Sequence, residues 1–174
     1  MNISVRPAQP EDAPEISRIY AESWRCAYRG MVPQEYLDEL KDKNDHWAER
    51  FRRDLGQGNL HAEMLFKGET PAGCVAYGKS RDDRLPDWGE IVSIYLHPDY
   101  FRHGYGTALL QAAVEKLKAQ GYPGCFLWVL DKNLNAQRFY EKNGFEGTRD
   151  ICHSEILGEQ LTEVRYRLLF KERQ

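Results

Sequence analysis

Hydrophobic and polar residues follow two different periods along this chain. In several segments the apolar side chains recur every three or four residues, which is the spacing of one face of an α-helix. Near the N-terminus Ile16, Ile19 and Tyr20 show this spacing, and Pro10 suits the first position of a helix. The pattern predicts four helical regions, which are 10–30, 33–54, 104–120 and 133–143.

Elsewhere the apolar residues alternate with polar ones, and β-branched and aromatic residues become frequent, as in β-strands. This pattern predicts seven strands, which are 2–6, 60–67, 72–79, 90–98, 125–130, 145–151 and 162–170. Strands and helices interleave along the chain without internal repeats, low-complexity tracts or a linker. We therefore expect one α/β domain that spans residues 1–174.

The composition is typical of a globular protein with a hydrophobic core. Of the 174 residues 41% are hydrophobic and 29% are charged, and the net charge is -3. Because nucleic-acid binding needs a basic surface, we do not expect nucleic acid as a partner. No apolar run approaches the roughly 20 residues of a membrane span. The acidic N-terminal segment MNISVRPAQPEDAPE is unlike a secretory signal, so we expect a cytoplasmic protein without a membrane partner.

The cysteines and histidines form no recognisable metal or disulfide pattern. Cys26, Cys74, Cys125 and Cys152 are scattered, without a C-x-x-C pair, and the histidines lack ligand spacing. We expect reduced thiols and no metal. Cys74 and Cys125 fall in predicted buried strands, which leaves Cys152 as the candidate for an exposed thiol.

Two glycine motifs compete as candidates for phosphate binding. The first, GCVAYGKS at 73–80, matches the phosphate-loop pattern G-x-x-x-x-G-K-[ST]. A working phosphate loop lies between a strand and a helix, but this segment follows a turn and consists of strand-forming residues. Pro86 also disfavours a helix after it. We interpret this motif as a β-strand bounded by glycines.

The second motif, FRHGYGTALL at 101–110, has the context that the first one lacks. A predicted strand precedes it and a predicted helix follows. The free N–H groups of a first helical turn point outward, where the helix dipole favours an anion. Gly104 and Gly106 remove side chains that would keep an anion away, although tight helix packing is an alternative role for them. Leu109 stands where a dinucleotide fingerprint needs glycine, so we predict a pyrophosphate site of another kind.

This segment resembles the [QR]-x-x-G-x-[GA] motif of the GNAT superfamily of N-acetyltransferases. Gly104 and Gly106 match its two glycines, and Phe101 departs from its Gln/Arg position. The segment NLNAQRFYEKNGF at 133–145 matches a second motif of that family, N-x-x-A-x-x-[FL]-Y-x-x-x-G-F. The resemblance is close over 88–147. It implies a mixed, mostly antiparallel twisted sheet of about seven strands, flanked by about four helices.

The same resemblance implies that acetyl-coenzyme A is the co-substrate. Residues 94–96 would hold its pantetheine arm through backbone groups, and 102–107 would hold its pyrophosphate. Asn133 would contact the pantetheine arm and also cap its own helix. The coenzyme-binding residues implied in this way are Ile94, Tyr95, Leu96, Arg102, His103, Gly104, Tyr105, Gly106, Thr107 and Asn133.

Two residues are catalytic candidates by the same resemblance. A tyrosine at the position of Tyr140 contacts the coenzyme sulfur in the family, so we expect Tyr140 to be the general acid for the departing thiolate. Glu90 lies fourteen residues before Gly104, the spacing of the glutamate base in the histone-modifying branch. We expect Glu90 to act as a base through water. The alternatives are a solvated charge at a strand end for Glu90 and a packing role for Tyr140.

These roles predict an N-acetyltransferase in which a primary amine attacks acetyl-coenzyme A directly in a ternary complex, since neither motif holds a cysteine. A non-catalytic acyl-coenzyme A sensor on the same scaffold is the alternative. The sequence does not distinguish between small-molecule amines and peptide amines as the acceptor. Trp24 and Tyr28, one helical turn apart, are candidates for its pocket, with core packing as the alternative for Trp24. The oligomeric state stays open too, with a homodimer as one candidate.

Overall fold

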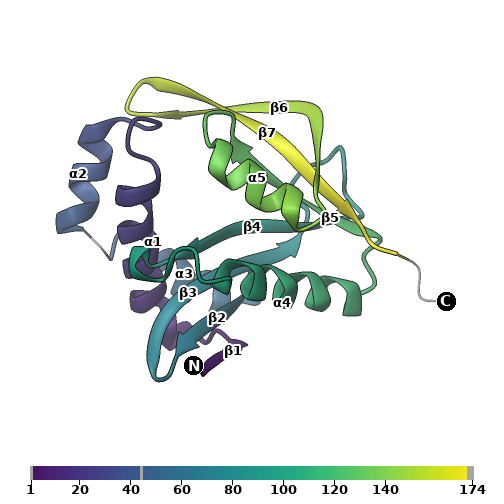
Figure 1. Cartoon of the computed structure of the whole chain (residues 1–174), viewed down its shortest axis with the longest axis horizontal. Helices are drawn as coiled ribbons and strands as arrows, with labels where there is room; N and C mark the ends of the chain where they lie inside the picture. Colours follow the sequence, from purple (N-terminus) through teal and green to yellow (C-terminus); the bar gives the residue numbers. More distant parts are fainter. Residues whose placement is uncertain (1, 44, 172–174) are drawn as a thin grey trace.

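The computed structural model describes residues 2–43 and 45–171, and a seven-stranded sheet forms its centre in the order β1-β2-β3-β4-β5-β7-β6 (Figure 1). The strands are β1 Ile3–Pro7, β2 His61–Lys67, β3 Thr70–Lys79, β4 Gly89–Leu96, β5 Gly124–Leu130, β6 Glu146–Ile156 and β7 Glu159–Leu169. The α-helices are α1 Ala13–Ala27, α2 Gln34–Asp42, α3 Ala48–Gly56, α4 Tyr105–Ala119 and α5 Leu134–Lys142. The predicted mixed, mostly antiparallel sheet is confirmed, because only β4 and β5 pair in parallel.

The helical region predicted at 33–54 is two helices, α2 and α3, rather than one. Leu37 of α2 packs in a cluster with Leu130 and Leu161, at the ends of β5 and β7. Phe51 of α3 instead packs against Tyr20 and the side chains of β2 and β3. The apolar stripes of the two helices therefore cover different parts of the sheet, which one straight helix would not reach.

The two C-terminal strands, β6 and β7, extend beyond the predicted ranges. A tight turn joins them at Leu157 and Gly158, whose φ angles of 49° and 83° are typical of a hairpin connection. The long hairpin reaches α2 (Figure 1), where Ile156 and Leu161 join the helical cluster. Packing against α2, rather than a local sequence pattern, explains the extra length.

The segment GCVAYGKS lies within and just after β3, so its interpretation as a strand is confirmed. A Cβ at Gly73 would lie 2.5 Å from Leu96 and 2.8 Å from Leu109, which leaves no room for a side chain. This glycine lets α4 approach the sheet closely. No helix directly follows Lys79, because the described residues 80–88 form an irregular loop.

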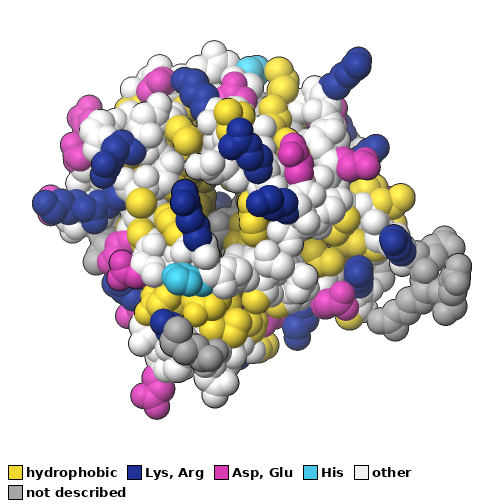
Figure 2. Space-filling view, in the orientation of Figure 1, with side chains coloured by type: hydrophobic (Ala, Val, Ile, Leu, Met, Phe, Trp, Pro, Cys, Tyr) yellow, Lys and Arg dark blue, Asp and Glu magenta, His cyan; other side chains and the backbone are white. Residues whose placement is uncertain are grey.

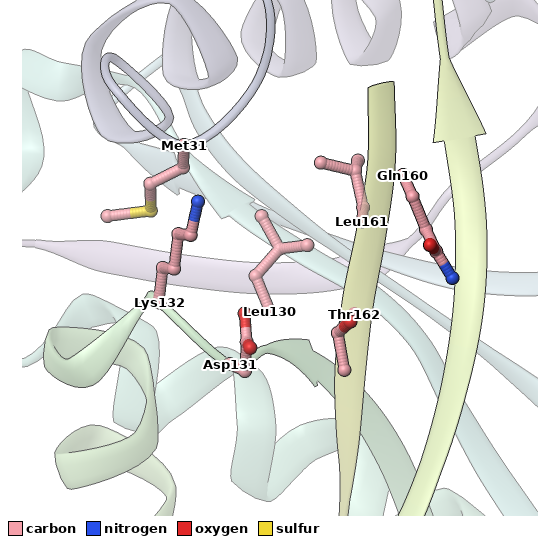
Figure 3. A pocket seen from close by; sticks show the side chains of 7 residues that line it. All are labelled: Met31, Leu130, Asp131, Lys132, Gln160, Leu161 and Thr162. Carbon is pink, nitrogen blue, oxygen red and sulfur yellow. The ribbon is translucent and has the colours of Figure 1, made fainter. Parts of the chain in front are cut away.

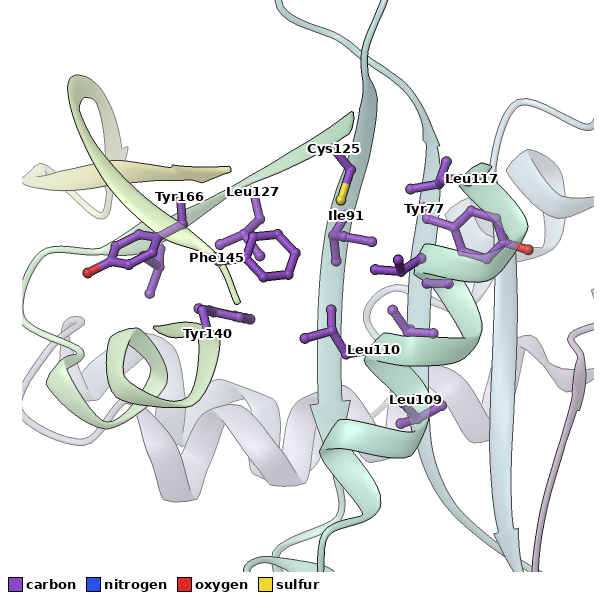
Figure 4. Close-up of a cluster of buried hydrophobic side chains, with 14 of the residues drawn as sticks. Tyr77, Ile91, Leu109, Leu110, Leu117, Cys125, Leu127, Tyr140, Phe145 and Tyr166 are labelled. Carbon is purple, nitrogen blue, oxygen red and sulfur yellow. The ribbon is translucent and has the colours of Figure 1, made fainter. Parts of the chain in front are cut away.

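Helices cover the central strands on both faces of the sheet. The largest core cluster lies under α4 and α5, where Leu109 and Leu110 of α4 and Tyr140 of α5 surround Ile91 of β4 (Figure 4). On the opposite face α1 and α3 pack against β2, β3 and β4. No helix in the described ranges 2–43 and 45–171 is long and apolar enough to cross a membrane.

Candidate active site

The sheet opens between its two parallel strands. Pairing of β4 with β5 is limited to Gly89 with Cys125 and Glu90 with Phe126, although β4 continues to Leu96. Beyond Glu90 the two strands separate, and no other described strand pairs with this edge of β4. Backbone groups on the edge are therefore available to an extended ligand, as in strand addition by a peptide. The predicted coenzyme-binding residues 94–96 lie on this open part.

A β-bulge lies where the opening begins. Ile91 pairs with Tyr77 and Ser93 pairs with Ala76, which leaves Val92 without a partner on β3. A bulge interrupts the regular ladder and redirects the side chains and backbone groups around it. The Ser93 hydroxyl hydrogen-bonds the Tyr20 hydroxyl of α1, so the bulged segment is held from the α1 side.

The start of α4 lies just beyond the open part of β4. Gly104 caps the helix with φ 79°, and Arg102 has φ 64°, both in the left-handed region that favours glycine. A Cβ at Gly104 would meet no atom within 4 Å, so the space beside it is open. The N–H of Ala108 is the first to bond within the helix, to the carbonyl of Gly104. The preceding N–H groups point out of the helix end and suit an anion.

The two glycines of this motif have different surroundings. A Cβ at Gly106 would lie 3.2 Å from the ring of Phe139, so this glycine has the packing role that the sequence left as an alternative. Arg102 and His103 are exposed beside Gly104. The structure places Tyr105 in the core, and Thr107 is half-buried.

The second motif forms α5, as predicted. Asn133 is confirmed as the helix cap, because its side-chain oxygen accepts the N–H of Ala136 at 3.2 Å. Ala136, Phe139 and Tyr140 all face the core beneath α5, which confirms the shared helical face. Gly144 ends the segment with φ 89°.

Tyr140 presents a buried phenol at the opening. Its side chain packs between Phe145 and Tyr166 (Figure 4), and 9% of it is exposed. The ring of Phe139 also packs against it. Burial raises the pKa of Tyr140 well above its ordinary value, and the nearby Tyr28 hydroxyl raises it further. Within the described chain its hydroxyl makes no hydrogen bond. Tyr140 therefore carries a proton that no group in residues 2–43 and 45–171 accepts.

Aromatic side chains from α1 and β4 face Tyr140 across the opening. The hydroxyls of Tyr28 and Tyr95 lie 3.0 Å apart, and the ring of Trp24 packs on that of Tyr28 at 4.7 Å. Burial raises the pKa of Tyr95 and of Tyr28, so both stay protonated near neutral pH. Trp24 and Tyr28 also pack against the α2 cluster. The structure thus shows the packing role for Trp24 that the sequence left as an alternative, and its pocket role stays a prediction.

Glu90 lies at the closed end of the opening and is 2% exposed, so the alternative of a solvated strand-end charge is wrong. Both of its oxygens are bound by Arg81. Oε1 accepts the backbone N–H and Nε–H at 3.0 and 3.2 Å, and Oε2 accepts Nη2–H at 2.6 Å. One lone pair of Oε2 remains for a water. Arg81 could not be predicted as a partner of Glu90 from the sequence, because no local pattern relates the 80–88 loop to this strand.

A second arginine holds that loop in place. The Arg165 side chain of β7 is 1% exposed and lies 4.8 and 4.5 Å from the ring centres of Phe126 and Trp128. Its Nη2 donates to Asp82 at 2.7 Å. Hydrogen bonds from Arg84 and Arg165 hold the pKa of Asp82 well below its usual range. This buried cation positions the loop that carries Arg81.

The surface shown in Figure 2 is hollowed near its centre, and lysine and arginine side chains stand around the hollow. A basic rim suits an anionic ligand. A separate cavity of about 60 Å³ lies between the α1–α2 connection and the ends of β5 and β7 (Figure 3). It is far smaller than a nucleotide-sized ligand. Its lining residues are Met31, Leu130, Asp131, Lys132, Gln160, Leu161 and Thr162.

The model of the acetyltransferase (GNAT) family matches residues 15–145. The chain belongs to the GNAT family. The match includes the open edge of β4, the starts of α4 and α5, and Tyr140. The β6–β7 hairpin lies beyond the matched residues of this GNAT chain.

Relatives of this GNAT chain are named N-acetyltransferases. Uncharacterized N-acetyltransferase YuaI of Bacillus subtilis (strain 168) is 30% identical over 93% of this chain and 90% of its own length. The spermidine N(1)-acetyltransferase of Thermoplasma acidophilum is 27% identical over 94% of this chain and 99% of its own length. These names support acetyltransferase activity.

Solved structures of similar fold confirm the predicted GNAT architecture. The PaiA N-acetyltransferase from Thermoplasma acidophilum, in complex with coenzyme A, has a TM-score of 0.75 and 23% identity over 98% of this chain and 100% of that one. The putative acetyltransferase yncA from Salmonella typhimurium, with its cofactor acetyl-CoA, has a TM-score of 0.73 and 17% identity. That match covers 98% of this chain and 95% of the other.

Proposed function

We propose that this GNAT chain transfers an acetyl group from acetyl-coenzyme A to a primary amine, by direct attack in a ternary complex. The observation that carries the proposal is the unbonded hydroxyl of buried Tyr140 at the open edge of β4. Two solved structures of similar fold hold coenzyme A or acetyl-CoA. Bound here, acetyl-coenzyme A would supply the acetyl group as a reactive thioester.

The binding residues fit a long anionic ligand. The N–H groups before Ala108 and the open space at Gly104 would hold the pyrophosphate, with Arg102 and His103 at its side. The unpaired edge over 94–96 would hold the pantetheine amides, and Asn133 would reach them from the start of α5. Glycine at 104 would admit the anion close to the backbone.

Tyr140 and Glu90 would divide the proton transfers between them. An amine must lose a proton before it attacks, and we assign that proton to Glu90 through a water on its remaining lone pair. Backbone N–H groups at the Val92 bulge would stabilise the carbonyl oxygen as it gains charge. Tyr140 would then give its proton to the departing sulfur. Burial favours this role, since the pKa of Tyr140 is raised and the phenol stays protonated.

One observation favours a second candidate function, a non-catalytic acyl-coenzyme A sensor. Arg81 binds both oxygens of Glu90, which leaves this carboxylate less available as a base. A sensor would use the same anion site and the same open edge of β4. It would have no use for a proton donor at Tyr140, and for this reason we place the enzyme first.

Release of free thiol from acetyl-coenzyme A tests the proposal. The purified protein is given a panel of alkylamines, polyamines, amino acids, aminoglycosides and peptides, and the thiol is measured with and without each amine. We expect at least one amine to increase thiol release and to become acetylated. Tight coenzyme binding without amine-dependent release across the panel would favour the sensor. Absence of coenzyme binding would contradict both functions.

A further inference from the structure

The β5–β7–β6 face of the sheet carries the carboxylate of Glu163. Side chains alternate along β7, so Leu161, Glu163 and Arg165 share one face of the sheet. The packing of Leu161 against α2, and of Arg165 on the aromatic rings of β5, shows that this is the α2 side. Glu163 lies between them, opposite Leu130 of β5 and Cys152 of β6.

Within the described chain, Glu163 differs from Glu90, Asp82 and Asp150 on this face in forming no ion pair, although its charge contributes to raising the pKa of the nearby Arg81 guanidinium. Glu90 pairs with Arg81, and Arg165 pairs with both Asp82 and Asp150. Among the described residues Glu163 forms no ion pair, and its one side-chain hydrogen bond comes from Cys152 Sγ at 3.4 Å. The hydrogen bonds of Arg81 go to Glu90, so the Glu163 carboxylate keeps lone pairs that a ligand ammonium could bind.

The surroundings of Glu163 connect it to the open edge of β4. The pKa of Tyr28 is raised by burial, by Tyr95 and also by the negative charge of Glu163. Burial and the Glu163 carboxylate raise the pKa of Cys152 to about 11. Leu130, which pairs with Glu163 across β5 and β7, packs in one cluster with Tyr28, so the geometry also places Glu163 near the tyrosine that faces Tyr140.

The walls around this carboxylate are apolar and aromatic. Leu130, Leu161, Trp24 and Tyr28 belong to one cluster, and the half-buried Trp128 lies two residues before Leu130 on the same face of β5. Methylene groups pack well on such walls, and aromatic faces attract an ammonium group. A carboxylate at the end of an aromatic and aliphatic wall is therefore suited to a cationic alkylamine, and it repels a carboxylate.

We propose that Glu163 binds a second, positively charged nitrogen of the acceptor, so that the preferred acceptors are diamines or polyamines rather than amino acids. This inference rests on the proposed function. The reacting amine would lie at the open edge of β4 between Tyr28 and Tyr140. The aliphatic chain would lie along Leu130 and Tyr28, and the distal ammonium would meet Glu163.

Three acceptors with the same five-carbon chain test this assignment. Cadaverine, aminopentanol and aminopentanoate end in an ammonium, a hydroxyl and a carboxylate respectively. We expect kcat/KM for cadaverine to exceed that for aminopentanol by about 10- to 100-fold, the usual effect of one charged hydrogen bond. Aminopentanoate is expected to be the poorest of the three. Equal kcat/KM values for the three acceptors, or a higher value for aminopentanoate, would overturn the proposal.

Substitutions at Glu163 assign the effect to this residue. Glu163→Gln is expected to remove the advantage of cadaverine while kcat for aminopentanol changes less than about 3-fold. Glu163→Lys is expected to reverse the order in favour of aminopentanoate. Glu155→Gln is the matched control, since Glu155 pairs with Gln160 on the same hairpin and its side chain alternates to the opposite face. A cadaverine advantage that survives in Glu163→Gln would overturn the assignment.

A binding measurement separates this inference from the proposed function. Cadaverine is titrated by calorimetry into wild-type and Glu163→Gln protein saturated with coenzyme A, and both proteins are checked for equal cooperative melting. Weaker cadaverine binding in the variant supports the role of Glu163 even if no amine is acetylated. Equal binding in the two proteins contradicts it, even if acetylation occurs.

Discussion

Gly106, in the first turn of α4, lies directly against the ring of Phe139 in α5: a Cβ at this glycine would be 3.2 Å from the ring atom Cζ. The two motifs that are separated in the sequence therefore meet at this contact. Phe139 is followed by Tyr140, so close packing at Gly106 brings the phenol towards the open edge of β4. The predicted anion site and the predicted acid are parts of one packed unit.

Gly104→Asp tests the anion site. The change puts a negative charge and a strained φ where we expect the pyrophosphate, and like charges in contact cost several kcal/mol. We expect acetyl-coenzyme A to bind about 100-fold more weakly by calorimetry. Gly121→Asp is the matched control, because Gly121 has φ 89° and open space beyond the other end of α4. Wild-type affinity for acetyl-coenzyme A in Gly104→Asp would mean that the pyrophosphate site is elsewhere. Lys79→Ala, in the segment GCVAYGKS, is expected to leave this affinity unchanged.

Tyr140→Phe tests the proposed acid. The ring stays and the proton for the departing sulfur is lost, so we expect kcat to fall by about 10² to 10⁴ with little change in coenzyme affinity. The control is Tyr166→Phe in the same core, which loses a 2.9 Å hydrogen bond to Glu141 and about 1 kcal/mol of stability. The control is expected to keep its kcat. Equal turnover of Tyr140→Phe and wild type, with chemistry rate-limiting, would leave Tyr140 a packing role.

Glu90→Gln tests the proposed base. Glutamine keeps the shape and can still accept the Arg81 backbone N–H, but it cannot take a proton from water. We expect kcat/KM to fall most near neutral pH and to recover partly at alkaline pH, where the amine loses its proton without help. The measurement is the full pH–rate profile of variant and wild type. An unchanged pH–rate profile would mean that Glu90 has only a structural role, which is to hold Arg81 and the 80–88 loop.

The thiol of Cys152 reports on the position of Glu163. Burial and the neighbouring carboxylate raise the pKa of Cys152 from 9.0 to about 11, so the thiol stays protonated at neutral pH and ionises only as the pH approaches that value. We expect iodoacetamide to alkylate Cys152 at least about 10-fold more slowly than the exposed Cys26 at neutral pH, measured site by site by mass spectrometry. Glu163→Gln removes a negative charge, lowers this pKa and is expected to speed the reaction. Fast alkylation of Cys152 in the wild type would contradict the contact.

Much of this protein was determined by its sequence alone. The positions of the seven strands, the starts of α4 and α5, the cap at Asn133 and the strand role of GCVAYGKS all follow from local patterns. Periodicity, glycine at helix ends and N-caps act over a few residues, so a single sequence displays them. The family resemblance came from two such local segments.

The tertiary structure decided the features that depend on distant residues. Arg81 reaches Glu90 from a loop, Tyr28 of the first helical region meets Tyr95 of β4, and Glu163 lies across from Cys152. Strand register and helix packing create these contacts, and neither leaves a periodic trace in the sequence. The same reason applies to the helical region at 33–54, where packing on two parts of the sheet, rather than local propensity, made two helices of one predicted segment.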